Sequence, residues 1–391
     1  MSTTRSSILF ARNLFLPADL GGNRYPWETI RRLASRGHPL TVTTPRLHPR
    51  FPPLPNVRYH LYPIWRPHPA ATQLTNLIGA TLALRSERGH DAALSGSYDA
   101  AQALGWARVA PRTPLVFLFH SVFYSEWVQA RPLARLVVGR YMQAVERQVF
   151  SLSARIVAVS NFSASQIRER SPSAAARVRV VPTGVDTEYF TPAADRAQLR
   201  THLGCPDDEP LVLGVGRLAG VKQFDRLITA FAVAAARGMP GRLVIAGDGP
   251  LRPQLEQLVG TYGMHDRIHL AGYCDPPRLR AWMQAADLQV CSSAFENLSL
   301  AILESMACGT PVLGTPGGGT PELLTAIDPD LVLADDHTHT LADALPVWCS
   351  DRQRLVERGA IARKLAVERY DWERVVDGLE TVFGEVVPGW R

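Results

Sequence analysis

The stretch FENLSLAILESMACGTPV, residues 295–312, organises the rest of the chain. Its two glutamates, Glu296 and Glu304, would stand about 80° out of register on one continuous helix. They converge only if a helix starts between them. Ser299 is a suitable N-cap for the apolar rhythm that follows, and Gly309 and Pro311 are typical of a helix end. The spacing therefore predicts a loop that carries Glu296 and a helix that carries Glu304.

A helix that starts at Ser299 leaves its first N–H groups unpaired and points its positive dipole end outward. Such a helix start predicts an anion site suited to a diphosphate, with the two glutamates on either side. The simpler alternative is an ordinary amphipathic helix with two surface glutamates.

Two further motifs follow: Cys-Gly-Thr-Pro-Val at residues 308–312 and Gly-Gly-Gly-Thr-Pro-Glu at residues 317–322. Together with the glutamate spacing they resemble the signature of family 4 glycosyltransferases. That family is retaining and has the GT-B fold, an α/β architecture of two Rossmann-like parallel-sheet domains facing a central cleft. The resemblance implies that Glu304 holds the nucleotide ribose and that Glu296 faces the donor sugar. It also places the donor phosphates at the backbone N–H groups of Asn297, Leu298 and Ser299.

Length and cysteine usage agree with such a chain. The 391 residues exceed what one hydrophobic core usually supports, so two domains are expected. Five cysteines without a Cys-x-x-Cys pair argue against a zinc site and a disulfide framework, and they fit a reducing cytoplasm. No segment approaches the roughly 20 apolar residues needed to span a bilayer. We therefore expect a cytoplasmic protein that is soluble or at most peripheral to a membrane.

Charge is distributed unevenly along the chain. Residues 1–185 hold 23 Arg and Lys against 8 Asp and Glu, whereas residues 186–391 hold 19 against 28. A basic half suggests an anionic partner or an adjacent acidic domain. Nucleic acid is not expected, because no aromatic-basic alternation, zinc ligands or RNA-binding signature accompanies the charge. The chain has 40 arginines and only two lysines, so a general preference for arginine inflates the total.

The first half predicts a parallel α/β domain. A short strand at residues 7–10, a glycine loop, a helix at about residues 25–36 and a strand at residues 40–43 form its first unit. The loop holds Gly21 and Gly22. On their own these glycines indicate a turn, and the family resemblance implies that they lie near the donor phosphates and the acceptor. The proline-rich residues 45–69 predict a long irregular connection that faces the acceptor.

A buried strand at residues 115–119 ends at His120. Parallel sheets bind ligands at the carboxyl ends of their strands, and the resemblance implies a catalytic histidine facing the donor sugar here. A satisfied structural histidine is the alternative. The next residues supply Tyr124, Glu126 and Trp127, which suit a polyhydroxylated or amine-bearing acceptor and equally suit packing. A helix at residues 132–149 with interspersed arginines would suit an anionic membrane, although such a helix is more often a solvated face.

The second half predicts the donor-binding domain. Arg217 and Lys222 bracket a loop between a strand and a helix, and two fixed cations can stabilise a departing diphosphate without a metal. The family has Lys-Gly where this chain has Lys222 and Gln223, which puts the local turn in doubt. Gly272 and Tyr273 follow a further strand and would lie near the nucleotide base. Exposed surface charges are the alternative for the two cations.

No metal site is expected. The triplet Asp328-Pro329-Asp330 mimics a metal-binding motif, but its proline and loop context indicate a chance match, and two nearby histidines lack further ligands at useful spacing.

The two halves together give the domain prediction. We expect an acceptor-binding domain at residues 1–185, a nucleotide-sugar-binding domain at residues 186–365 and a C-terminal helix at residues 366–391 that crosses back to the first domain.

These observations predict a retaining glycosyltransferase with no cofactor, using a nucleotide sugar, UDP-sugar favoured, and a small-molecule hydroxyl acceptor. No nucleophile or general base stands out, so the family resemblance implies front-face attack. Segments at residues 20–28 and 118–127 resemble enzymes that glycosylate aminoglycoside pseudodisaccharides, which implies a cationic acceptor held by Glu28 and Glu126. The alternatives are a peripheral-membrane enzyme with a lipid or cell-envelope glycan acceptor and a non-catalytic sugar-nucleotide-binding protein.

Overall fold

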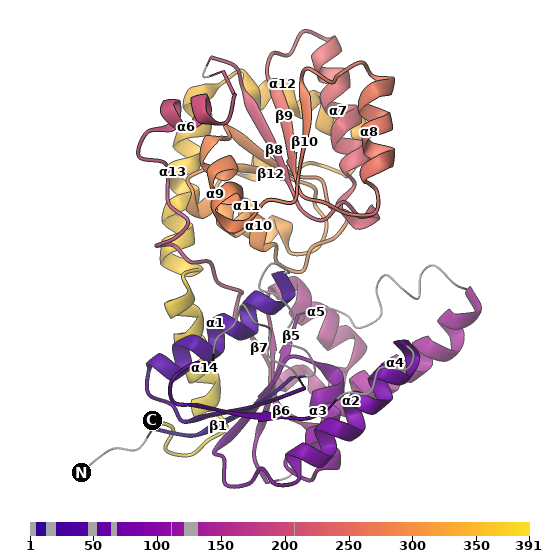
Figure 1. The fold of residues 1–391 in the computed structure, drawn as a ribbon, viewed down its shortest axis with the longest axis vertical. Coiled ribbons are helices and arrows are strands. Elements are labelled where there is room, and N and C mark those ends of the chain that lie inside the picture. Colours follow the sequence, from indigo (N-terminus) through magenta and orange to yellow (C-terminus); the bar gives the residue numbers. More distant parts are fainter. Residues whose placement is uncertain are drawn as a thin grey trace. The chain divides into compact units, whose positions relative to one another are not determined.

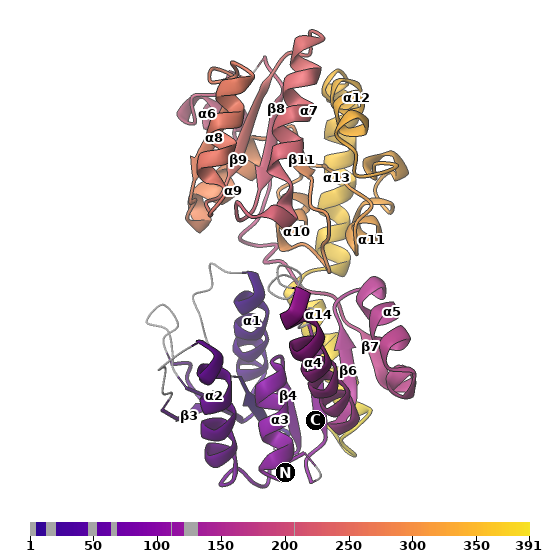
Figure 2. The ribbon, with the colours of Figure 1, turned by 90° about the vertical axis from the view of Figure 1, so that its right-hand side faces the viewer.

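The computed structural model describes residues 5–12, 21–45, 53–63, 69–110, 112–120, 132–206 and 208–391. The chain divides into two compact units, one of Met1–Pro182 with Val375–Arg391 and the other of Thr183–Arg374. Each unit contains one parallel sheet with helices on both faces (Figure 1; Figure 2). This arrangement confirms the predicted α/β class with two parallel-sheet domains.

The first sheet has the strand order β3-β2-β1-β4-β5-β6-β7, and all neighbouring strands are parallel. Its strands are β1 (Ile8–Ala11), β2 (Leu40–Thr44), β3 (Val57–Leu61), β4 (Ala92–Ser95), β5 (Leu115–Phe119), β6 (Ser153–Ala158) and β7 (Val178–Val180). The helices of this unit are α1 (Gly21–Ser35), α2 (Pro69–Leu84), α3 (Tyr98–Trp106), α4 (Pro132–Leu152), α5 (Asn161–Arg170) and the 3-10 helix η1 (Pro172–Arg177). Helices α2, α3 and α4 lie side by side on one face of the sheet (Figure 2).

Buried His38 contacts both the C-terminal helix α14 (Trp372–Gly384) and the residues after it. The Nδ1 atom of His38 lies 2.9 Å from the carbonyl oxygen of Ser6, and its Nε2 atom lies 2.8 Å from Oε1 of Glu380. The imidazole ring also stacks on Trp390, with ring centroids 5.0 Å apart. Residues near both ends of the chain therefore share one core.

The second sheet has the strand order β10-β9-β8-β11-β12 and is also parallel throughout. Its strands are β8 (Leu211–Val215), β9 (Arg242–Ala246), β10 (Ile268–Gly272), β11 (Leu288–Cys291) and β12 (Val312–Gly314). The longer helices are α6 (Arg196–His202), α7 (Phe224–Ala236), α8 (Arg252–Thr261), α9 (Pro276–Ala285), α10 (Leu300–Ala307), α12 (Thr338–Cys349) and α13 (Arg352–Arg369). The short ones are η2 (Gly220–Lys222), α11 (Thr320–Leu324) and η3 (Pro329–Leu331).

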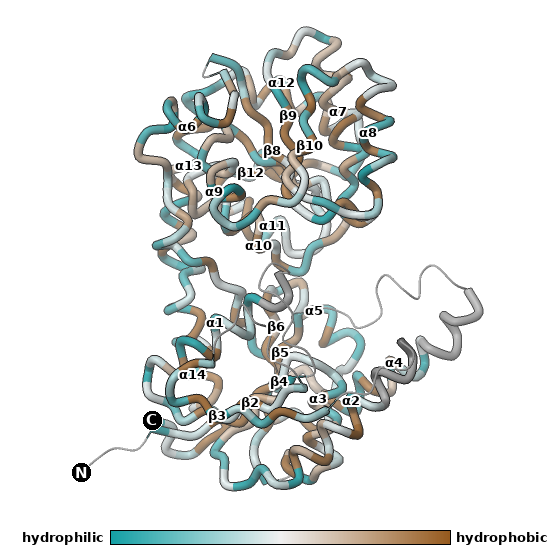
Figure 3. The backbone as a smooth tube through the Cα atoms, in the orientation of Figure 1, coloured by the Kyte–Doolittle hydropathy of each residue, from teal (hydrophilic) through white to brown (hydrophobic). Residues whose placement is uncertain are grey.

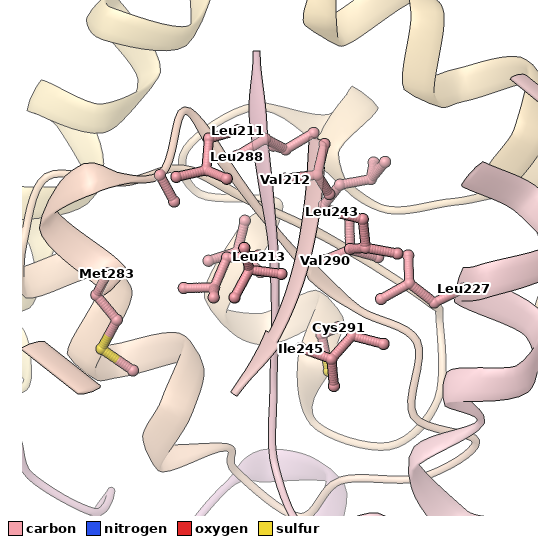
Figure 4. Close-up of a cluster of buried hydrophobic side chains, with 14 of the residues drawn as sticks. Leu211, Val212, Leu213, Leu227, Leu243, Ile245, Met283, Leu288, Val290 and Cys291 are labelled. Atoms are coloured by element: carbon pink, nitrogen blue, oxygen red, sulfur yellow. The ribbon is translucent and has the colours of Figure 1, made fainter. Parts of the chain in front are cut away.

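Aliphatic side chains from adjacent strands form the centre of this unit (Figure 4). Leu213, Ile245 and Val290 are buried within the sheet, and Leu227 of α7 and Met283 of α9 pack against it from opposite sides. Strands β8 and β9 are accordingly hydrophobic over much of their length (Figure 3). Each such side chain contributes roughly 1.5–3 kcal/mol when fully buried. The sheet is therefore a rigid base for the loops at its carboxyl edge.

Two sequence-based expectations about elements were wrong. The connection predicted to be irregular over residues 45–69 contains strand β3, which pairs with β2, and ends at the first residue of α2. Prolines flank residues 57–61 without entering them, so this short run keeps every N–H donor it needs for an edge strand. The predicted glycine loop also differs, because α1 begins at Gly21. The N–H groups of a first helical turn need no intrahelical partner, so glycines are tolerated there.

Candidate functional site

The strand order of the second sheet reverses direction between β8 and β11. Parallel α/β sheets bind ligands at such a switch point, outside the carboxyl ends of the strands. The loop after β8 leads to Lys222, and the loop after β11 leads to Glu296. The predicted cation and the predicted carboxylate therefore follow the two strands between which a ligand site is expected.

Lys222 and Glu296 form an ion pair. The Nζ atom of Lys222 lies 2.5 Å from Oε1 of Glu296, and the two side chains are 22% and 15% exposed. Ser293 donates a second hydrogen bond, 2.8 Å long, from its Oγ atom to the same carboxylate oxygen. The attraction between the two charges offsets the cost of their partial desolvation, so the pair is stable next to the start of α10.

Backbone contacts hold the two loops together. Ala294 donates its N–H to the carbonyl of Val221 at 2.8 Å, and Ser292 donates its hydroxyl to the carbonyl of Lys222 at 2.7 Å. On the other side, the N–H of Gly319 bonds to the carbonyl of Glu296 at 2.7 Å. Gly318 has a φ of +73°, and a Cβ atom there would lie 1.9 Å from the Glu296 carbonyl oxygen. The Gly-Gly-Gly motif thus allows the closest approach of backbone to the Glu296 loop.

Helix α10 begins at Leu300, with Ser299 in an extended N-cap conformation, so the predicted start between the two glutamates is confirmed. The side chain of Ser299 makes no capping hydrogen bond, contrary to the usual role of an N-cap serine. Glu304 is 5% exposed and lies one turn inside this helix. Asn297 and Leu298 are partly buried in the loop that precedes the helix.

Arg217 has an exposed side chain that makes no hydrogen bond or ion pair with any residue that the structure describes. A hydrogen bond joins the loop after β8, which carries Arg217, to the loop after β9: Leu218 donates its N–H to the carbonyl of Asp248 at 3.0 Å. Gly272, at the end of β10, has a φ of +72°, and Tyr273 after it is 54% exposed. These residues line the same edge of the sheet as the ion pair and keep polar or aromatic surface available to a ligand.

Gln223 takes the place where the family pattern has glycine. Its φ of 49° and ψ of 42° lie in the left-handed region, and α7 begins at the next residue. The turn therefore forms as it would with glycine, at a conformational cost of about 1–2 kcal/mol for a residue with a Cβ atom. The side-chain oxygen of Gln223 is buried and has no hydrogen-bond partner within the described ranges.

His120 lies directly after β5 at the carboxyl edge of the first sheet, as predicted. Its ring makes an edge contact with Tyr25, with centroids 4.7 Å apart, and a Cβ atom on Gly96 would lie 3.3 Å from its Nε2 atom. Burial, and secondly the charge of Arg12, lower the pKa of His120 to about 3. The imidazole is therefore neutral at physiological pH and can donate or accept a hydrogen bond without carrying charge.

Arg12, Ser292 and Ser293 lie at the carboxyl ends of strands, and the sequence did not single them out as candidates. Arg12 directly follows β1, and burial lowers its guanidinium pKa to about 10, so it stays charged at neutral pH. An arginine that ends a buried strand is a signal that could have found it. Ser292 and Ser293 directly follow β11, and both are 3% exposed.

Glu28, predicted to bind an acceptor ammonium group, contacts two arginines of its own helix. Its carboxylate lies 2.9 Å from Arg31 and also pairs with Arg32. Two guanidinium groups already compensate this charge, so acceptor binding by Glu28 would compete with both. Gly21 and Gly22 stand in the first turn of α1. Three predicted acceptor residues, Tyr124, Glu126 and Trp127, lie outside the described residues.

The carboxylates of the Asp328-Pro329-Asp330 triplet form ion pairs with arginines. Oδ2 of Asp328 lies 2.7 Å from Arg358 and 3.0 Å from Arg354, and these bonds lower the carboxyl pKa against the opposing effect of burial. Within the described ranges, no group of three or more His, Cys, Asp or Glu side chains could hold a metal ion. In the same part of the chain, no helix combines the length and the hydropathy needed to cross a membrane.

The two-sheet fold and the polar site at its switch point define an α/β ligand-binding protein, and comparisons identify its family. A family model described as Glycosyltransferase Family 4 matches residues 21–189, and one described as Glycosyl transferases group 1 matches residues 195–365. The chain is 30% identical to the alpha-D-kanosaminyltransferase of Streptomyces kanamyceticus over 70% of this chain and 71% of that protein. It is 31% identical to the D-inositol 3-phosphate glycosyltransferase of Thermobispora bispora over 94% of this chain and 91% of that protein.

Solved structures match the fold of this chain over nearly its whole length. Sucrose-phosphate synthase from Thermosynechococcus elongatus has a TM-score of 0.81 at 22% identity, covering 97% of this chain and 99% of that chain. HepE from Anabaena in complex with UDP has a TM-score of 0.77 at 19% identity, covering 97% and 100%. The chain belongs to glycosyltransferase family 4 and is a glycosyltransferase with the GT-B fold.

Proposed function

We propose that this enzyme transfers a sugar from a UDP-sugar to a hydroxyl group of a small cyclitol acceptor, with retention of the anomeric configuration. The observation that carries the proposal is the Lys222–Glu296 ion pair at the switch point of the second sheet, directly before the start of α10. Structures of HepE with UDP and with UDP-glucose support the choice of nucleotide.

The second unit would hold the donor. Glu304, buried in α10, would accept hydrogen bonds from the ribose hydroxyls. The N–H groups at the start of α10 would face the diphosphate. Arg217 has a free and exposed guanidinium among the described residues, so it is able to bind a phosphate without breaking an existing ion pair. Lys222 would share its charge between Glu296 and the diphosphate. This arrangement concentrates cationic charge where negative charge develops on the leaving group.

The first unit would hold the acceptor and contribute His120. In the transfer, the acceptor oxygen forms a bond to the anomeric carbon on the face from which the diphosphate leaves, and the bond between that carbon and the diphosphate oxygen breaks. The acceptor proton passes to the departing phosphate oxygen. His120 is neutral above a pH of about 3, so we propose that it orients the donor sugar by hydrogen bonding and does not act as a cationic acid.

For the acceptor we favour an aminocyclitol of the aminoglycoside type. The similarity to alpha-D-kanosaminyltransferase supports a place in antibiotic biosynthesis. A phosphorylated cyclitol is the second candidate, because several relatives are D-inositol 3-phosphate glycosyltransferases that match over 90% of this chain. The excess of basic residues in residues 1–185 also favours that second candidate.

A donor and acceptor screen read by mass spectrometry tests the proposal. The purified enzyme is incubated with UDP-sugars or GDP-mannose, paired with an aminocyclitol pseudodisaccharide, D-inositol 3-phosphate or vesicles that contain anionic lipid. Transfer from a UDP-sugar to the pseudodisaccharide supports the favoured proposal. Transfer only to D-inositol 3-phosphate selects the second candidate. Tight vesicle binding without turnover of any cyclitol selects a lipid-glycosylating enzyme, and binding of UDP-sugars without transfer to any acceptor selects a non-catalytic binding protein.

A further inference from the structure

We propose that Ser293 is a positioning residue that fixes the Glu296 carboxylate so that its second oxygen is presented to the donor. The inference rests on the proposed use of a nucleotide sugar by this site. It goes beyond the motif residues, because Ser293 would not touch the substrate and would act only through Glu296.

The two oxygens of Glu296 have different surroundings. Oε1 receives hydrogen bonds from both Lys222 Nζ, at 2.5 Å, and Ser293 Oγ, at 2.8 Å. Oε2 receives none from the described part of the chain, and it is not among the buried polar atoms that lack a partner. Oε2 is therefore the oxygen that solvent or a ligand hydroxyl can reach.

Lys222 alone would not fix this orientation. A lysine ammonium is a point charge on a flexible stem and attracts either carboxylate oxygen. A serine hydroxyl has one proton to donate, and its Oγ atom lies only one carbon from the backbone, so it can reach only the carboxylate oxygen nearest to it. The bond from Ser293 therefore selects Oε1, and a hydrogen bond to a charged acceptor is about twice as strong as a neutral one.

The backbone that carries Ser293 is itself fixed. Ser293 is 3% exposed, and its carbonyl accepts a 2.5 Å hydrogen bond from the hydroxyl of Thr315. The N–H of Thr315 in turn bonds to the carbonyl of Cys291, the last residue of β11, at 3.1 Å. The position of the Glu296 carboxylate is thereby tied to the central strands of the second sheet.

A double-mutant cycle tests whether Ser293 acts through Glu296. Ser293→Ala, Glu296→Gln and the double variant are compared for kcat and KM with the donor, and for inhibition by UDP, which lacks the sugar. We expect Ser293→Ala to lower kcat/KM for the donor roughly 10- to 100-fold, as for loss of one hydrogen bond to a charged group, and to leave the inhibition constant of UDP unchanged. The same change in the Glu296→Gln background should cost much less, and Ser293→Thr, which keeps the hydroxyl, should restore activity.

Ser305→Ala is the matched control. Ser305 is also fully buried in this unit, and its hydroxyl bonds to Gln289 without contacting Glu296. Any loss caused by Ser305→Ala should be the same with and without Glu296→Gln, because it acts through the packing of α10. An equal cost of Ser293→Ala in both backgrounds would show that Ser293 serves the fold alone and would overturn the proposal.

Crystal structures of the enzyme and of Ser293→Ala decide the same point without an activity assay. We expect the Glu296 carboxylate of the variant to rotate or to occupy several orientations. A carboxylate that keeps its place overturns the positioning role even if transfer is slow. If the enzyme uses no nucleotide sugar at all, the proposed function fails, and these structures still decide whether Ser293 orients Glu296.

Discussion

Lys222 meets two anions in the proposed reaction: the carboxylate of Glu296, which it contacts in this structure, and the diphosphate of the donor. It is one of two lysines in a chain with 40 arginines. Arginine would bind one carboxylate through a rigid bidentate fork, whereas a lysine ammonium can turn from one anion to the other. Lysine therefore suits a position where the developing charge on the diphosphate must be met during the reaction.

Lys222→Ala should lower kcat roughly 10²–10³-fold, because it removes a charge that acts mainly in the transition state. The loss also leaves Glu296 uncompensated beside the diphosphate, which adds repulsion. Steady-state kinetics with a UDP-sugar measure the effect. Lys364→Ala is the control, since that lysine is 74% exposed on α13 and lies 3.9 Å from Glu368. An unchanged kcat in Lys222→Ala would remove Lys222 from the reaction.

The residues of the candidate site were predictable to different degrees. Lys222, Glu296 and Glu304 stand in motifs that the family resemblance made visible. Arg12 stands in no such motif, because its effect on His120 comes from a contact between segments far apart in sequence. Ser293 lies only three residues before Glu296, but its hydrogen bond to that carboxylate depends on the shape of the loop and could not be read from the sequence. Glu28 shows the opposite case: the resemblance of residues 20–28 to aminoglycoside-glycosylating enzymes suggested an acceptor carboxylate, but arginines three and four positions later on the same helix pair with it.

At the scale of elements, α10 was predictable because its start and end are encoded locally. Gly309 has a φ of +78°, and the N–H of Thr310 bonds to the carbonyl of Ser305 at 2.9 Å, as expected where glycine ends a helix. Strand β3 was not predictable from proline content, because an edge strand is stabilised by its pairing with β2 rather than by its own sequence. The start of α1 at Gly21 likewise contradicts local propensity, because glycine is a poor helix former.

The turn before α7 offers a test of this local reasoning. Gln223→Gly should increase the free energy of unfolding by roughly 0.5–1 kcal/mol, because relief of the left-handed strain exceeds the added entropy of the unfolded chain. Urea unfolding measures the change. Gln257→Gly is the matched control: this glutamine lies inside α8, where glycine should destabilise by about 1 kcal/mol. A destabilised Gln223→Gly variant would mean that the side chain of Gln223 makes a contact stronger than the strain.

At the scale of the whole molecule, part of the excess positive charge of residues 1–185 is compensated within the first unit by carboxylates from the C-terminal end of the chain. The acidic residues of α14 and the following turn pair with its arginines: Arg36 with Asp377 at 2.8 Å, and Arg155 with Glu385 at 2.6 Å. Sequence counting over consecutive residues could not show this, because these carboxylates come from the far end of the chain. The parallel two-sheet architecture itself was predictable from the alternation of buried strands and amphipathic helices.

His120 gives a pH dependence of unfolding. Its pKa is about 3 in the folded protein, against an ordinary value of 6.5, so between these values the unfolded chain binds the additional proton. Stability should therefore fall as the pH is lowered through this window, by up to about 1.4 kcal/mol per pH unit for this group. Urea unfolding at pH 7 and pH 5 should show a smaller decrease for His120→Gln than for the unaltered enzyme. Equal decreases would mean that His120 is protonated in the folded state.

Chelation tests the charge arrangement of the enzyme as a whole. We propose that Arg217, Lys222 and the start of α10 supply the positive charge that metal-dependent glycosyltransferases obtain from a divalent cation. Transfer assays with EDTA should then retain nearly full activity, and added Mg²⁺ or Mn²⁺ should increase it little. A strict requirement for either ion would overturn this proposal.

The stereochemistry of the product tests the central proposal most directly. Transfer from an α-linked UDP-sugar to the acceptor found in the screen is followed by proton NMR of the first product formed. Front-face attack beside the Lys222–Glu296 pair predicts an α-linked product, recognised by the small coupling constant of its anomeric proton. A β-linked product would contradict the proposed mechanism, because it requires attack from the opposite face by an acceptor activated by a general base.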